Sequence, residues 1–182
     1  MNCQTQNISK KVWHFSYIDN TCQNEKVLKC LQKSKSIRTI FSPIEGLGPS
    51  SESFVDACIS RFRYMRVLDL SDSCFEVLPS SISTMKHLRW LDLSRNCRIK
   101  KLPNSICKLQ NLQTLVLDGC ENLEELPKDI RYMINLRWLF ITSKQRSLPG
   151  SLNSLRALRV LGLSNYGNIE SLFGVTRGYT GL

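Results

Sequence analysis

Apolar residues recur along most of this chain with a period of 22 to 24 residues. Five segments share the pattern Leu-x-x-Leu-x-Leu, with Met or Ile replacing one leucine in two of them; they start at Met65, Leu88, Leu112, Leu136 and Leu158. A Leu-Pro pair follows each of the first four, at 78–79, 102–103, 126–127 and 148–149. Further apolar residues come three and six positions after each proline. Within each core, apolar and variable residues alternate, which predicts a short strand with its leucines pointing inward.

This spacing is the signature of leucine-rich repeats, whose period lies between about 20 and 29 residues. One repeat cannot bury its own leucines, but stacked copies form a parallel sheet with a continuous core. The sequence therefore predicts an α/β leucine-rich-repeat solenoid. This is a curved right-handed coil with a parallel β-sheet on its concave face and mostly irregular or short helical return segments. The register places five leucines in one inward column: Leu68, Leu91, Leu115, Leu139 and Leu161.

The ends of the chain depart from the repeat. Residues 12–18 alternate and predict the strand that starts the sheet, and IRTIFS at 37–42 is a degenerate earlier copy. Residues 25–33 and 54–62 have apolar residues at helical spacing, with a Gly/Pro/Ser loop between them. We therefore expect three parts: an opening strand, helices and a degenerate repeat in 1–60, five leucine-rich repeats in 61–173, and an unstructured or truncated end in 174–182.

Charge narrows the range of partners. The formal net charge is +10, but its sign alternates: seven bases and one acid in 86–108, five acids and one base in 118–129, six bases and no acid in 131–159. Such bands suit a patterned protein-contact surface better than they suit a duplex-binding face. The chain has no apolar stretch of about 18 residues and no signal sequence at its start. We expect a cytoplasmic protein with a protein partner, and neither membrane nor nucleic acid.

No arrangement of side chains indicates catalysis or metal binding. The eight cysteines are scattered, without a CxxC pair or neighbouring histidines, which favours small buried thiols over zinc ligands or disulfides. The two histidines, His14 and His87, are far apart, and no Ser, Cys or carboxylate pattern resembles a catalytic triad. We expect no enzyme activity, no cofactor and no metal.

The linked repeats resemble the leucine-rich-repeat domain of plant intracellular nucleotide-binding leucine-rich-repeat (NLR) disease-resistance proteins, the coiled-coil type in particular. The run 62–127, with Leu-Pro at fixed offsets, is close to that family's typical repeats. ISKKVWHFSYI resembles the strand that opens the domain, where the family usually has Arg-His-Leu-Ser; Trp13 replaces the arginine and Phe15 the leucine. The sequence lacks a GxxxxGK[ST] phosphate loop and coiled-coil heptads. We therefore expect a truncated product or a fragment without the nucleotide switch.

This resemblance implies a protein-interaction module of a plant innate-immunity receptor. Such a module docks on a nucleotide-binding module, recognises a pathogen or host protein, or does both. In this family the repeats nearest the nucleotide-binding module tend to restrain the switch and later repeats tend to recognise, so a chain with mostly early repeats favours docking. The alternative is a generic intracellular leucine-rich-repeat scaffold or adaptor without a defence role. The absence of an F-box or other effector segment in the sequence counts against the adaptor.

The same register identifies candidate partner-binding residues on the concave face. The outward side chains are those of Trp90, Asp92, Thr114, Val116, Trp138 and Phe140. At about 4.8 Å per strand, Trp90 and Trp138 lie roughly 9–10 Å apart. They either anchor a partner or pack across Thr114 and cover the sheet. One position earlier, Arg89 and Arg137 belong to a basic edge, which is either a solvated rim or a guide for an acidic partner.

Because the cysteines are expected to be reduced, thiol titration of denatured protein prepared without reductant should find all eight free. Stoichiometric zinc, or a set of thiols that reacts only after reduction, would contradict this prediction.

Overall fold

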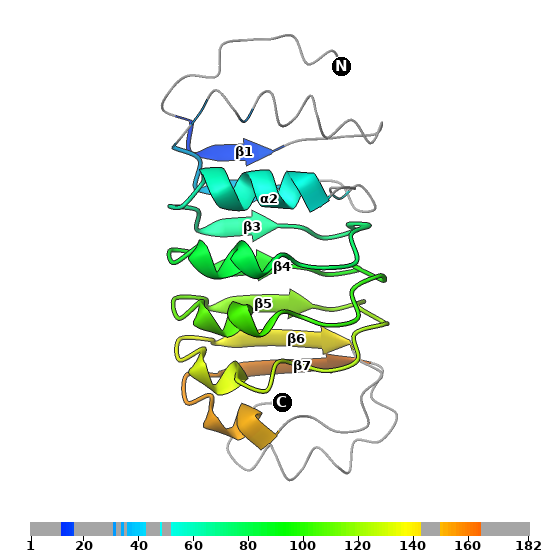
Figure 1. Ribbon diagram of the computed structural model, residues 1–182. Helices are drawn as coiled ribbons and strands as arrows, with labels where there is room; N and C mark the ends of the chain where they lie inside the picture. Colours follow the sequence, from blue (N-terminus) through cyan, green and yellow to red (C-terminus); the bar gives the residue numbers. More distant parts are fainter. Residues whose placement is uncertain are drawn as a thin grey trace.

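One parallel sheet organises the molecule. The computed structural model describes residues 12–16, 31, 34, 36–42, 48, 52–142 and 150–164. In this part of the chain seven strands lie side by side in chain order, all parallel (Figure 1). The strands are β1 (His14–Ser16), β2 (Thr39–Phe41), β3 (Val67–Asp69), β4 (Trp90–Asp92), β5 (Thr114–Leu117), β6 (Trp138–Thr142) and β7 (Val160–Ser164). Each strand is short because its repeat supplies only the alternating part of the apolar pattern.

A second layer of short helices covers one side of this sheet (Figure 1). It consists of α2 (Glu52–Arg61) and the 3₁₀ helices η1 (Ser80–Thr84), η2 (Asn104–Lys108), η3 (Ile130–Tyr132) and η4 (Gly150–Ser154). Pro79 and Pro103 directly precede η1 and η2 in an extended conformation, with φ of −59° and −65°. Proline suits this place because its φ is fixed and no ladder needs its missing N–H. From β2 to β7 a helix of this layer lies between each strand and the next, as expected of the right-handed crossovers that join parallel strands in nearly all cases.

The core lies between the two layers. Leu68, Leu91, Leu115, Leu139 and Leu161 pair in register across β3 to β7, which confirms the predicted inward column. The first four are fully buried, and Leu161 is partly buried against the same core. From the return segments come the apolar residues that follow each proline: Ile82, Met85, Ile106, Leu109, Ile130, Met133, Leu152 and Leu155. The positions that are apolar in every repeat are thus those that pack on their counterparts in neighbouring turns.

Buried polar side chains close the turns that follow β3, β4 and β5. The Asn96 amide donates to the carbonyl oxygens of Leu70, at 2.8 Å, and Leu93, at 2.7 Å. In the next repeat the Cys120 thiol donates to Leu93 O at 3.0 Å, and in the previous one the Ser73 hydroxyl donates to Leu70 O at 2.7 Å. Asn96, Cys120 and Ser73 thus satisfy carbonyl groups that the stacked turns would otherwise bury without partners.

The same turns contain a left-handed residue in three successive repeats. Asp72, Arg95 and Gly119 have φ values of 54°, 57° and 73°. Glycine adopts this conformation freely, whereas a residue with a side chain is strained there. Arg95 binds Asp72 with two parallel hydrogen bonds, of 2.8 and 2.7 Å, so the two strained residues are held by one bidentate ion pair.

The remaining expectations have different outcomes. The opening strand, the degenerate copy and the helix at 54–62 are confirmed as β1, β2 and α2. Most of 25–33, the Leu148-Pro149 pair and everything after Ser164 lie outside the described residues, and the three-part division of the chain stays a prediction. None of the described helices has the length and apolar character that crossing a membrane requires.

Asn96→Ala should lower the free energy of unfolding by about 2 kcal/mol, because it removes two buried hydrogen bonds of about 1 kcal/mol each. The carbonyl groups of Leu70 and Leu93 then keep the bonds from Ser73 and Cys120. Asn111→Ala is the matched control: its amide also donates to a backbone carbonyl, Lys86 O at 2.8 Å, but at an exposed site. Urea denaturation of both variants measures the difference. Equal losses would show that the buried position of Asn96 is unimportant.

Candidate functional site

The outward side chains of the sheet stand in three columns that run across the strands. The first outward column contains the residues that open most strands: Thr39, Val67, Trp90, Thr114, Trp138 and Val160. Trp90 is 42 % exposed and Trp138 is half-buried, while Thr114 between them is only 4 % exposed. The two indoles therefore flank and shield a small hydroxyl on the middle strand. Trp90 thus covers part of its neighbour and still keeps a large exposed surface, and the role of the pair as an anchor for a partner stays a prediction.

The second outward column changes from acidic to apolar along the solenoid. Its members on β3 to β7 are Asp69, Asp92, Val116, Phe140 and Gly162. A Cβ atom at Gly162 would lie 2.5 Å from Cδ1 of Phe140, so the phenylalanine ring leans over the glycine on the neighbouring strand. The lack of a side chain at Gly162 is what allows the ring to lie there.

Hydroxyl groups and one carboxylate form the third outward column: Ser71, Ser94, Asp118, Thr142 and Ser164. Asp118 accepts hydrogen bonds from the hydroxyls of Thr142, at 2.6 Å, and Ser164, at 2.7 Å. The Thr142 hydroxyl in turn accepts a bond from Gly119 N–H at 2.8 Å. These donors favour the ionised carboxylate, so they lower the pKa of Asp118, first through Thr142 and then through Ser164.

Asp69 and Asp92 are in a different electrostatic situation. They face each other across β3 and β4, and both are half-buried. Asp92 accepts one bond from Ser94 N–H at 2.8 Å, and Asp69 accepts from Ser71 N–H at 2.9 Å and Ser42 N–H at 3.2 Å. Desolvation is the main cause that raises the pKa of Asp92, and the neighbouring Asp69 charge adds to it against the effect of the bonds from Ser94.

A basic edge lies one residue before the first outward column. It comprises Arg66, Arg89, Gln113, Arg137 and Arg159, whose backbone groups continue the ladder, as in the 2.8 Å bond from Arg89 N–H to Arg66 O. Arg66, Arg89 and Arg159 are exposed and Arg137 is half-buried. Within the described part of the chain, none of these four arginines forms an ion pair. The face thus combines cations on one border, aromatic rings in the middle and carboxylates beside them.

Comparison with known proteins identifies the family. A family model described as a leucine-rich repeat region matches residues 47–173, well over half of the 182 residues. The chain belongs to the leucine-rich repeat family. Among curated proteins, none matches the sequence. Leucine-rich repeat domains are generally protein-interaction modules, which agrees with an open sheet face that carries aromatic and charged side chains.

Two solved structures show the same fold. A leucine-rich repeat protein of Leptospira interrogans is 28% identical with a TM-score of 0.59, over 72% of this chain and 32% of that chain. The leucine-rich repeat domain of the type III effector XopL is 27% identical with a TM-score of 0.53, over 58% of this chain and 38% of that chain. This leucine-rich repeat chain therefore spans about a third of the length of the solved chains that it resembles.

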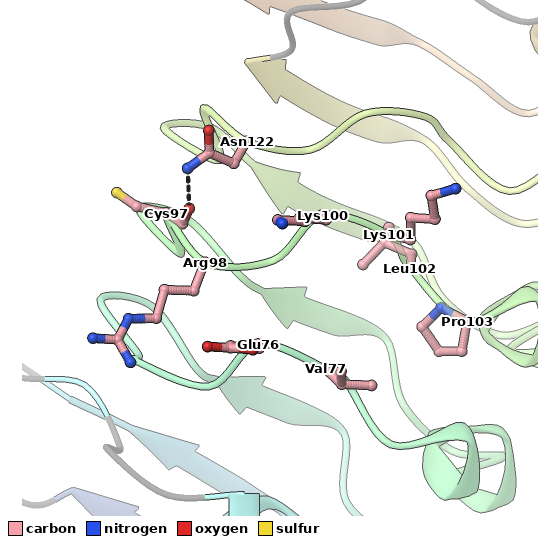
Figure 2. Close-up of a pocket in the computed structure, with 9 residues that line it drawn as sticks. All are labelled: Glu76, Val77, Cys97, Arg98, Lys100, Lys101, Leu102, Pro103 and Asn122. Carbon is pink, nitrogen blue, oxygen red and sulfur yellow. Dashed lines mark hydrogen bonds between the residues drawn. The ribbon is translucent and has the colours of Figure 1, made fainter.

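Outside the concave face, a groove lies on the flank of the repeats (Figure 2). The groove has a volume of about 540 Å³ and a rim that carries Arg98, Lys100, Lys101 and Glu76. The Asn122 amide donates to Cys97 O of the neighbouring turn at 2.6 Å. The Lys101 ammonium group lies 3.6 Å from carboxylate oxygens of Glu124 and Glu125. The basic side chains are thus partly neutralised by the acidic band of the next repeat, so this groove is a weaker candidate than the sheet face.

Possible reactive groups are few in this leucine-rich repeat structure. Among the residues that it describes, no group of three or more His, Cys, Asp and Glu side chains could hold a metal ion. Burial raises the pKa of the Cys107 thiol to about 11 and that of the Cys120 thiol to about 12, so both stay protonated at neutral pH. The expectation of buried thiols is wrong for Cys74 and Cys97, which are exposed.

The candidate residues named from the sequence all lie on or beside the concave face. Trp90, Thr114 and Trp138 are brought together in one column, Asp92, Val116 and Phe140 in the next, and Arg89 and Arg137 on the basic edge. Two contributors were missed: Val160, which is 40 % exposed, and Gly162 beneath the Phe140 ring. Extending the outward assignment to the fifth copy of the repeat is the signal that would have found them. Asp69, which the repeat register also places outward, lies opposite Asp92.

Asp92→Asn should stabilise the fold at neutral pH. The pKa of Asp92 is higher in the folded state than in the unfolded state, so folding favours the protonated carboxyl. The free energy of unfolding therefore includes this contribution in full below the unfolded pKa and loses it as pH rises through the folded pKa. The asparagine keeps an acceptor for Ser94 N–H without the charge. We expect a higher Tm than wild type at pH 7 and no difference below the ordinary carboxyl pKa of 3.8.

Asp118→Asn is the matched control for that experiment, and its sign is opposite. The pKa of Asp118 is lowered, so its ionised form adds stability above the unfolded pKa, and this stability is lost as pH falls through the folded pKa. We expect a lower Tm at pH 7. Shifts of the same sign in both variants would contradict the electrostatic account of this face.

Proposed function

We propose that this chain is the protein-interaction module of a plant intracellular disease-resistance receptor of the coiled-coil NLR class, acting in the cytoplasm. The support is the linked series of repeats with Leu-Pro at fixed offsets, together with the ISKKVWHFSYI segment that resembles the family's opening strand. In the structure this segment contributes β1, which begins the sheet next to β2. The partner is a nucleotide-binding module of the same receptor class, a pathogen or host protein, or both in turn.

The observation that carries the interaction role is the composition of the concave face. Trp90 leaves 42 % of its surface in water although an aromatic side chain of that size gains from burial, and Val160 in the same column leaves 40 %. Exposed tryptophans next to arginines are the residue types that dominate binding energy at protein interfaces. A partner that covers the first outward column would bury this apolar area, with the basic edge on its border.

The basic edge adds long-range attraction to this contact. Arg89 and Arg137 lie beside the two tryptophans in sequence and on the same border of the sheet. Exposed cations at the rim of an interface accelerate encounter with an acidic surface and contribute little to the lifetime of the complex. An acidic patch on the nucleotide-binding module would therefore suit this border.

Trp90→Ala and Trp138→Ala should weaken binding to the nucleotide-binding module by more than about 1 kcal/mol each, because large outward side chains are lost while the core stays closed. Arg89→Glu and Arg137→Glu should mainly slow association, and more strongly at low salt. Surface plasmon resonance at two ionic strengths separates these effects on dissociation and association.

Matched controls come from the outer side of the solenoid. Tyr132→Ala removes an aromatic side chain that is 52 % exposed, and Arg98→Glu reverses an exposed charge in the flank groove. Neither should change binding. Tryptophan variants that lose folding would make the pair purely structural, and variants that fold and bind unchanged would exclude this face as the docking site.

A second test separates the receptor proposal from a generic leucine-rich-repeat scaffold. The genomic sequence upstream of the codon for Met1 should contain a reading frame that encodes a GxxxxGK[ST] phosphate loop, since the receptors of this class carry one before their repeats. An upstream sequence without any such frame would favour the scaffold without a defence role.

A further inference from the structure

The second outward column has a chemical order that the proposed function does not use. From β3 to β6 it reads Asp69, Asp92, Val116 and Phe140, so two carboxylates are followed by two apolar side chains. Neighbouring members are about 4.8 Å apart, the spacing of hydrogen-bonded strands. A ligand that lies along the column therefore meets negative charge at one end and apolar surface at the other.

Among the described residues, no ion pair neutralises the acidic end of the column. Like charges directly opposite each other on neighbouring strands are destabilising. In the part of the chain that the structure describes, neither Asp69 nor Asp92 takes part in an ion pair. Their hydrogen bonds come from backbone N–H groups and, at Asp92, also from the Ser94 side chain. The Arg95 guanidinium, which is paired with Asp72, acts on Asp92 only as a weaker electrostatic influence. The third carboxylate of the face, Asp118, is bonded by two hydroxyls instead. A positive group placed over Asp69 and Asp92 would interact with both charges at once.

An aromatic wall stands beside these carboxylates. Trp90 precedes Asp92 by two residues on β4, so both side chains point to the same side of the sheet, about 7 Å apart along the strand. A guanidinium or ammonium group that contacts Asp92 lies within reach of the exposed indole face, where cations are attracted electrostatically. The position thus favours the side chain of arginine or lysine.

The apolar end is closed by the Phe140 ring. Because the ring leans over Gly162, it fills the place of the next side chain in the column and presents its surface beside Val116. Both residues are half-buried, and each still has surface to lose on contact with an apolar side chain.

Strand spacing and peptide spacing match along this column. Side chains on one side of an extended segment recur every 6.8 Å or so, at about 3.4 Å per residue. Measured from the midpoint of Asp69 and Asp92, Val116 lies about 7 Å away and Phe140 about 12 Å away, at about 4.8 Å per strand. If a basic side chain of the peptide lies at that midpoint, the side chain two residues later in the peptide lies near Val116. The side chain four residues later lies near Phe140.

We propose that the concave face binds an extended segment of a protein partner along this column, with arginine or lysine on Asp69 and Asp92 and an apolar side chain four residues away on Phe140. The proposal rests on the proposed function, since it names the chemistry of the segment that the interaction face receives. The paired carboxylates disfavour nucleic acid and acidic peptides at this position. The basic edge lies on the border of the same face and receives acidic groups that flank the segment.

The test uses the full chain and a fluorescein-labelled probe peptide, acetyl-Ser-Arg-Ser-Val-Ser-Leu-Ser-amide, with fluorescence anisotropy as the readout. Replacing the arginine of the probe by glutamate should weaken binding at least tenfold. Moving the leucine one residue closer to the arginine should weaken it at least threefold, because the side chain then points away from the sheet. Raising the salt concentration should reduce the preference for arginine.

Variants of the protein locate the effect. Asp92→Asn should weaken binding of the arginine probe at least fivefold, and Asp92→Lys should remove the preference between the arginine and glutamate probes. Phe140→Ala should weaken both probes by a similar factor. Asp129→Asn, which removes a carboxylate on the outer flank beside η3, is the matched control and should leave both affinities unchanged. Thermal unfolding of each variant confirms that it is folded.

The results also separate this inference from the proposed function. No binding of the arginine probe, a preference for the glutamate probe, or an Asp92→Asn variant that binds as wild type does would overturn the inference, even if the tryptophan variants weaken binding to the nucleotide-binding module. Selective binding of the arginine probe without any binding to that module would leave the inference standing and reject docking on a nucleotide-binding module.

Discussion

Stacking of the inward leucines on one another is the interaction on which the rest of this structure depends. A single repeat of about 23 residues has two or three leucines on one side and no second layer large enough to bury them. In the solenoid each of Leu91, Leu115 and Leu139 has a leucine neighbour in the turn before and after it, and all three are fully buried. Burying a leucine side chain contributes about 1.5–3 kcal/mol, so a turn becomes stable only when its neighbours are present.

This constraint explains why one face of the sheet is free to vary. Every second strand residue is committed to the core, and its alternates point to the concave side without a layer above them. Their mutual contacts still give the face a definite structure: Thr114 is shielded between two tryptophans, and Phe140 leans over Gly162. A surface of this kind can change its partner by substitution while the fold is unaffected.

Polar groups inside the turns are the second requirement of close stacking. Turns only about 5 Å apart exclude water from their carbonyl groups, so buried donors such as Asn96 must replace it. The left-handed residues at Asp72, Arg95 and Gly119 allow the chain to leave the strand sharply at the same place in each repeat. Where two of these residues are not glycine, a bidentate ion pair between them offsets part of the strain.

The sequence by itself determined the fold, the register and the direction of each strand side chain, because the period of the leucines and the alternation around them allow only one way to bury the apolar residues. It therefore also predicted which residues face outward, including Trp90, Asp92, Trp138 and Phe140. Only the tertiary structure decided how those side chains meet. Asp69 and Asp92 are 23 residues apart in sequence, and Asp118 and Ser164 are 46 apart, but each pair lies together on the sheet. Shielding of Thr114, the lean of Phe140 and the opposite pKa shifts of Asp92 and Asp118 follow from contacts between strands, which no local pattern encodes.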